Sequence, residues 1–125
     1  MVITQPRRLE LQTAIDSGLT VHIAAPRSEH GQQVAQVIAQ ALQQQGAQTE
    51  IHADPEEDLL RSAQGPVIVV GNLADSRCVR GLYYRSRCAT DLCYPGPGGY
   101  ELRTLCDHFG TGHNLILIGY SDADG

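Results

Sequence analysis

Residues 94–125 read YPGPGGYELRTLCDHFGTGHNLILIGYSDADG and contain two strand-like runs, Gly99–Cys106 and Asn114–Tyr120. Glycine-rich turns stand before, between and after these runs. The segment that joins them is too short for a helical crossover, so the two strands should pair antiparallel. The sequence therefore predicts a hairpin at the C-terminal end of the fold.

Three further strands are predicted before this hairpin. Leu19–Ala25 (LTVHIAA) is rich in strand-forming residues. Ala47–Ala53 (AQTEIHA) alternates apolar and polar residues, which suggests an edge strand or a strand with one solvated face. Pro66–Val70 (PVIVV) is continuously apolar, as expected of a central strand that is covered on both faces.

Helices should alternate with these strands. The clearest is Gln32–Gln45, with Ser28 as its N-cap and Gly46 just after its C-terminus. A short helix is expected at Glu56–Ser62. A longer one should start after Asn72, with Asp75 completing a capping box, and run to about residue 84 or 87. The buried stripe of the first helix should consist of Val34, Val37, Ile38, Ala41 and Leu42.

This order of elements predicts an α/β (α+β) fold. Right-handed crossovers make the first three strands parallel, so the sheet should be mixed, with four or five strands and two main helices. We expect residues 18–125 to form a single domain of a larger protein. Residues 1–17 should be an N-terminal extension that is partly ordered, as either a short strand or a frayed turn.

Composition excludes several classes of protein. The 125 residues carry 42% hydrophobic and 18% charged side chains, as expected of one folded domain. The net charge is −5 and the basic residues are scattered, which argues against nucleic-acid binding. The sequence contains no run of eighteen apolar residues, so it predicts no membrane span. The N-terminus lacks the apolar core of a signal peptide, but a domain cut from an extracytoplasmic protein would lack it too, so localisation stays open.

Two segments offer residues for binding. The turn Gly71-Asn72 follows a central strand, where free backbone amides could hold a phosphate or carboxylate; the alternative is a simple helix cap. The loop Tyr94–Tyr100 could present tyrosines to a sugar or peptide, or could only feed the hairpin, and Tyr94-Pro95 is a candidate cis peptide bond. The candidate binding residues are Gly71, Asn72, Tyr94, Gly98, Gly99, Tyr100 and Asp122.

The sequence does not predict a catalytic or metal site. No nucleophile elbow or pair of converging carboxyl groups can be read, so no catalytic residue is assigned. Cys106, His108 and His113 flank the hairpin turn and could bind zinc together with His22, but their spacing is that of a plain turn. We therefore expect no metal and no cofactor. His22 should be a packed or half-solvated histidine of its strand.

The cysteines do not form a recognisable motif. Cys78, Cys88, Cys93 and Cys106 lack the spacing of a zinc ribbon or a redox pair. Reduced, partly buried thiols are expected. The alternative is a disulfide that involves Cys88 or Cys93.

Three segments carry a resemblance to a known family: PVIVVGNLADSRCVRGLYY (66–84), GPGGYELRT (96–104) and HNLILIGYSDADG (113–125). They resemble the small α/β domain that precedes the catalytic barrel in carbohydrate-active enzymes such as β-hexosaminidases and α-glucuronidases, and related regions of bacterial polysaccharide-processing proteins. In that family, the chain continues after the last glycine into a helix that covers the sheet.

The resemblance implies a non-catalytic accessory domain that packs against the catalytic domain of a larger glycoside hydrolase or polysaccharide lyase. The isolated chain should then have no activity of its own, and an uncovered sheet face could also support a homodimer. The alternative is a small module that binds a carbohydrate or an anion through the 94–100 loop and the 71–72 helix start. A stand-alone hydrolytic or metal enzyme is the least favoured interpretation.

Overall fold

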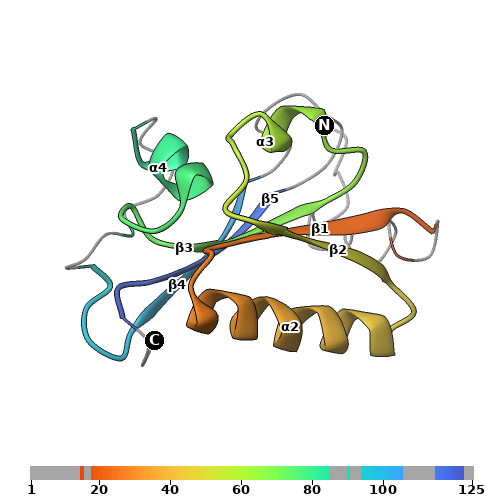
Figure 1. The fold of residues 1–125 in the computed structure, drawn as a ribbon, viewed down its shortest axis with the longest axis horizontal. Helices are drawn as coiled ribbons and strands as arrows, with labels where there is room; N and C mark the ends of the chain where they lie inside the picture. The colour runs from red at the N-terminus through yellow and green to blue at the C-terminus, as the bar shows by residue number, and fades with distance from the viewer. Residues whose placement is uncertain (1–14, 16–17, 85–89, 91–93, 106–114, 123–125) are drawn as a thin grey trace, which may run out of the picture.

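One mixed sheet organises the fold (Figure 1). The structure is a computed structural model that describes residues 15, 18–84, 90, 94–105 and 115–122. Its strands lie in the order β2-β1-β3-β5-β4. The elements in chain order are β1 (Thr20–Ala25), α2 (Glu29–Gln44), β2 (Gln48–Ala53), α3 (Leu59–Ser62), β3 (Val67–Gly71), α4 (Arg77–Tyr84), β4 (Tyr100–Leu105) and β5 (Leu115–Tyr120).

The strand directions confirm the predicted α/β fold with a mixed sheet. β1 pairs parallel with both β2 and β3, and β3 pairs parallel with β5. β4 pairs antiparallel with β5, from Tyr100 opposite Tyr120 to Leu105 opposite Leu115. The C-terminal hairpin that the sequence predicted is therefore present at one edge of a five-stranded sheet.

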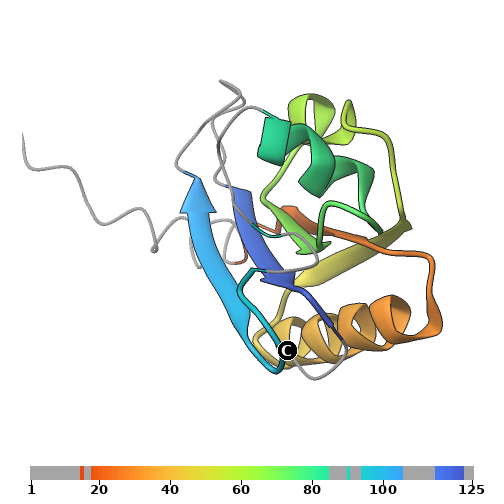
Figure 2. The ribbon, with the colours of Figure 1, turned by 90° about the vertical axis from the view of Figure 1, so that its left-hand side faces the viewer.

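The helices cover the two faces of the sheet separately (Figure 2). α2 lies on one face, against a core that includes Val21, Ile23 and Val70. α3 and α4 lie on the other face, against Val69 and Leu117. The central strand β3 is buried along its whole length, which explains its continuous apolar sequence. The predicted edge strand is β2, and its alternating burial matches its alternating sequence.

The buried stripe of α2 differs from the predicted one. The helix starts at Glu29, where the N–H of Gly31 donates to the Ser28 hydroxyl (3.1 Å), so the predicted N-cap is confirmed. The fully buried positions are Gly31, Ala35 and Ala39, whereas Val37 is 68% exposed. Val34, Ile38 and Leu42 of the predicted stripe are partly buried and pack against the core beside these small residues. The predicted stripe is therefore confirmed in part, whereas its remaining members, Val37 and Ala41, are exposed.

The other two helices begin later than predicted. α3 is a single turn that starts at Leu59, after the turn-forming residues 56–58. α4 starts at Arg77, because the capping pair of Asn72 and Asp75 closes a separate turn over residues 72–76. Ser76 then caps α4, since its hydroxyl accepts the N–H of Val79 (3.1 Å).

Gly119 of β5 is a close-packing point between the sheet and the chain segment at Thr90. A Cβ atom at position 119 would overlap the Thr90 side chain, which is fully buried. We therefore expect Gly119→Ala to lower the free energy of unfolding by about 1–3 kcal/mol in urea denaturation. Thr90→Ala in the same chain should recover part of that loss. Equal losses in the single and double variants would contradict this account of the packing.

Candidate functional site

The carboxyl ends of β1 and β3 form a topological switch point. The chain leaves β1 toward α2 on one face and leaves β3 toward α4 on the other (Figure 2). In open α/β sheets, ligands bind in the crevice that such a divergence creates. Two of the predicted binding residues, Gly71 and Asn72, lie here.

Asn72 is buried and is fully engaged within the protein. Its side-chain oxygen accepts the N–H groups of Ala74 (2.8 Å) and Asp75 (3.2 Å), and its side-chain amide donates to the carbonyl of Tyr120 (3.1 Å). The Asp75 carboxylate in turn accepts the N–H of Asn72 at 2.8 Å. This reciprocal pair is the capping box that the sequence predicted, and it ties the end of β3 to the end of β5.

The amides that could hold an anion at this turn already have acceptors. Besides the three amides in the capping box, the N–H of Leu73 donates to the Thr90 carbonyl (3.1 Å). The N–H of Arg77 donates to a carboxylate oxygen of Asp54 (2.9 Å). A phosphate or carboxylate would have to displace these internal acceptors, two of which, Asp54 and Asp75, are themselves carboxylates.

The 94–100 loop is braced against the residues that follow β5. The N–H of Gly96 donates to the Ser121 hydroxyl (3.3 Å), and that of Gly98 to a carboxylate oxygen of Asp122 (3.2 Å). Gly99 closes the loop by donating to the carbonyl of Gly96 (3.0 Å). The Tyr94-Pro95 bond is cis, as predicted. Four of the predicted residues (Gly98, Gly99, Tyr100 and Asp122) therefore lie together at this end of the sheet.

The loop tyrosines face solvent. The side chain of Tyr94 is 50% exposed and that of Tyr100 is 68% exposed. Asn72, in contrast, is buried, although its side chain donates to Tyr120 at the same end of β5. The seven predicted residues thus form an exposed loop with a buried polar support rather than one continuous surface.

Sequence reasoning missed a polar cluster behind this loop. The rings of His30 and Tyr120 meet edge to face, with centroids 5.3 Å apart. His30 Nε2 and the Tyr120 hydroxyl are buried without a hydrogen-bond partner among the described residues. Burial raises the pKa of Asp75, and burial together with the Asp75 charge raises the pKa of Tyr120 to about 12. Asp75 lies 45 residues from His30 and 45 residues from Tyr120 along the chain, so no local sequence pattern marked the cluster.

The raised pKa of Asp75 predicts a specific pH dependence of stability. Because the folded state binds the Asp75 proton more readily than the unfolded state, this group costs stability above its folded pKa, and the cost vanishes as pH falls. Asp75→Asn keeps an oxygen that can accept the Asn72 N–H. We expect this variant to be more stable than the parent in urea unfolding at pH 7, with the difference shrinking toward pH 4. A difference that grows on acidification would contradict the assigned direction.

A second region of interest is an apolar surface on the α2 face of the sheet, which extends from one flank of α2 to the β4-β5 hairpin. One flank of α2 faces β2, where Gln43 bonds Thr49 (2.8 Å), and the opposite flank faces β5, where His30 contacts Tyr120. The α2 side chains on the β5 flank and the hairpin side chains on the same sheet face together make what we call the apolar groove. It consists of Val34, Val37, Ile38, Tyr100, Leu102, Ile116 and Ile118.

Much of the apolar groove is open in the part of the chain that the structure describes. Leu102 is 66% exposed, and it lies beside Ile118 in the strand register. A hollow of about 300 Å³ runs along the α2 side, lined by His30, Gln33 and the three aliphatic residues of that flank. α2 packs mainly on β1, β2 and β3, so it gives the hairpin strands β4 and β5 little cover on this face of the sheet.

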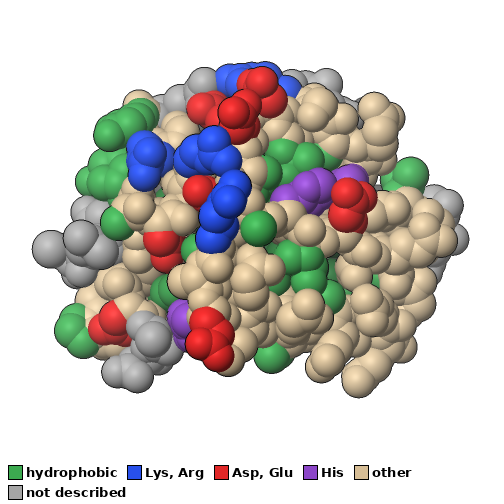
Figure 3. All heavy atoms as spheres, in the orientation of Figure 1, with side chains coloured by type: hydrophobic (Ala, Val, Ile, Leu, Met, Phe, Trp, Pro, Cys, Tyr) green, Lys and Arg blue, Asp and Glu red, His purple; other side chains and the backbone are tan. Residues whose placement is uncertain are grey.

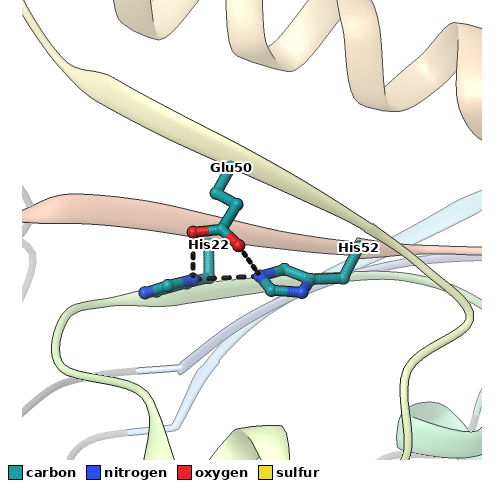
Figure 4. Close-up of side chains that lie close together, drawn as sticks. All are labelled: His22, Glu50 and His52. Atoms are coloured by element: carbon teal, nitrogen blue, oxygen red, sulfur yellow. Dashed lines mark hydrogen bonds and ion pairs between the residues drawn. The ribbon is translucent and has the colours of Figure 1, made fainter.

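A cluster of three potential ligands lies on the opposite face of the sheet, across β1 and β2 (Figure 4). His22 Nδ1 lies 3.0 Å from His52 Nε2. The Glu50 carboxylate reaches to 3.9 Å from His22 Nδ1 and to 3.6 Å from His52 Nε2. Burial and then the neighbouring His52 lower the pKa of His22, against the opposing effect of Glu50. Among the described residues, this is the group that could hold a metal ion.

The other residues considered for metal or redox chemistry are mostly not placed. Cys106, His108 and His113 lie outside the described residues, as do Cys88 and Cys93. Cys78 is a free thiol and is completely buried on α4. Burial, followed by the charge of Asp54, raises its pKa to about 12, and a buried thiol of this kind is unreactive.

Comparison with known proteins adds no relative. The chain matches no protein-family model, no curated protein and no solved structure. The resemblance to accessory domains of carbohydrate-active enzymes therefore stays a prediction. Among the described residues no helix is long and apolar enough to cross a lipid bilayer.

Proposed function

We propose that this chain is a non-catalytic scaffolding module, which packs its apolar groove against an adjoining domain of a polysaccharide-processing protein. The observation that carries the proposal is the rotation of α2. Gly31, Ala35 and Ala39 are the buried residues of α2, Val34 and Ile38 are only partly buried at the edge of the core, and Val37 is left exposed on the groove side.

The exposed apolar side chains of the groove cost free energy as long as they remain in contact with water. Burying a Val, Leu or Ile side chain stabilises a complex by roughly 1.5–3 kcal/mol. Val37 and Leu102 are each about two-thirds exposed, and Val37 lines the hollow along α2. Contiguous exposed apolar side chains of this kind typically mark a surface for another protein or domain. The adjoining catalytic domain is the partner that the family resemblance implies.

The first test asks whether the groove is open in the isolated chain. We expect Leu102→Glu and Val37→Glu to change the free energy of unfolding by no more than about 1 kcal/mol, because both side chains already lie in water. Gln36→Glu, on the α2 flank that faces β2, is the matched control. A loss above about 2 kcal/mol in either groove variant, with Gln36→Glu unaffected, would mean that the groove is already filled within the monomer.

The second part of the test concerns the partner. The adjoining domain, supplied as a separate polypeptide, should bind the parent chain and the Gln36→Glu variant equally in calorimetry. The two groove variants should bind it at least tenfold more weakly. If the parent chain instead forms a dimer in light scattering that Leu102→Glu abolishes, the partner is a second copy. That result would replace the scaffolding role.

A second candidate function is carbohydrate binding by the 94–100 loop. The specific observation is that two exposed tyrosines sit on a loop held by hydrogen bonds to Ser121 and Asp122. Aromatic rings on a fixed support offer stacking area with little loss of conformational entropy on binding.

This candidate predicts that oligosaccharides perturb the tyrosine ring signals of Tyr94 and Tyr100 in an NMR titration. Tyr94→Ala should weaken binding about tenfold, consistent with the loss of one stacked ring. Tyr84→Ala removes an exposed tyrosine from α4 and should leave the affinity unchanged. Titration curves that stay flat across a panel of neutral and acidic oligosaccharides would remove this candidate.

A further inference from the structure

The His22, Glu50 and His52 cluster is built by strand register. His22 lies directly opposite Glu50 in the parallel pairing of β1 with β2, and His52 follows two residues later on β2. Because side chains alternate along a strand, all three lie on the same face of the sheet. Figure 4 shows both rings and the carboxylate directed toward one another. The backbone of two paired strands therefore holds the three groups together.

The distances within the cluster suit a small divalent cation. Zinc bonds of about 2.0–2.1 Å in a tetrahedral arrangement place neighbouring ligand atoms about 3.3 Å apart. The two imidazole nitrogens lie 3.0 Å apart, one Glu50 oxygen lies 3.6 Å from His52 Nε2, and the other Glu50 oxygen lies 3.9 Å from His22 Nδ1. A turn of the Glu50 carboxylate that brings one oxygen toward both nitrogens, with a slight separation of the two rings, would place three ligand atoms around one ion. The Glu50 side chain is exposed enough to make that adjustment.

The cluster is accessible from solvent. The His22 side chain is 14% exposed and that of His52 is 24% exposed, against 60% for Glu50. In the space-filling view, histidine side chains lie at the surface beside an acidic side chain (Figure 3). His22 also lines a hollow of about 410 Å³ between β1 and the α3 segment, together with Thr20, Leu59 and Ser62. An ion can thus enter, and water or a small ligand can reach it.

We propose that His22 Nδ1, His52 Nε2 and a Glu50 carboxylate oxygen form a zinc site with one open coordination position. Two imidazoles and one carboxylate are a common three-ligand set for zinc in proteins, with water in the fourth position. In the metal-free protein, one of these two nitrogens donates its N–H to the other across their 3.0 Å contact. For zinc to bind, the donor ring must change tautomer, so that its proton moves through solvent to its other nitrogen, and the ion then joins the edge strand β2 to β1. This proposal does not depend on the scaffolding role.

The test is calorimetric titration of chelator-treated, tag-free chain with zinc chloride at pH 7.5. We expect one equivalent to bind. Glu50→Gln and His52→Gln should each lower the affinity for zinc. The loss should be at least the roughly 10–100-fold that follows when a hydrogen-bond partner of a metal ligand is removed. Zinc should raise the melting temperature of the parent chain, because it binds the folded state. It should not raise that of His52→Gln.

A control and a direct readout separate this site from other donors. The double variant His108→Gln/His113→Gln should bind zinc as the parent does. The nitrogen chemical shifts of His22 Nδ1 and His52 Nε2 should move on zinc addition, while those of the other histidines stay unchanged. The ring-nitrogen chemical shifts of His22 and His52 can be measured in the folded parent chain, so this readout does not depend on whether any variant folds.

Two results would overturn the proposal. One is zinc binding that survives in both Glu50→Gln and His52→Gln but is lost in the double histidine variant. The other is binding of much less than one equivalent by the folded parent chain, with no shift at His22 or His52.

Discussion

The close approach of α2 to the sheet is the constraint on which the surface of this domain depends. A Cβ atom at Gly31 would lie 2.7 Å from the backbone oxygen of Pro26, so only glycine lets the helix start so near the end of β1. Ala35 and Ala39 continue this contact at four-residue intervals and are fully buried. Small side chains on this line fix the rotation of the helix. The same rotation leaves Val34 and Ile38 only partly buried at the edge of the core and turns Val37 outward, on the side of the apolar groove.

The sequence predicted those features that depend on local pattern. The hairpin follows from two strand-like runs joined by a short segment, and the buried strand β3 follows from its unbroken apolar residues. The caps at Ser28 and Asn72 could also be predicted, since each is a short-range interaction between a side chain and a backbone N–H. Hydrophobic periodicity predicted that α2 is a helix and that Val34, Ile38 and Leu42 face the core, but it missed the most buried positions, which are glycine and alanine, and included the exposed Val37. Small residues carry little hydrophobic signal, so their closer contact with the sheet could not be predicted from the pattern.

The two features that the sequence did not reveal both depend on long-range register. His22 and Glu50 become neighbours only because β1 pairs with β2 in one particular alignment, and a slip of one residue would turn Glu50 to the other face. The contact of His30 with Tyr120 likewise joins the start of α2 to the end of the last strand. Nothing in the sequence near any of these residues specifies its partner.

The hairpin strand β4 also has a consequence for local stability. Within the described part of the chain, β5 is its one strand neighbour, whereas the four parallel strands hold one another. Local opening of β4 would leave the parallel sheet and its two cores paired, so this edge should open at a lower free-energy cost than the rest. A molecule seated in the apolar groove contacts β4 and β5 at once. Occupation of the apolar groove would then be coupled to the closing of the β4 edge. Slower hydrogen exchange of the β4 amides would report that the groove is filled.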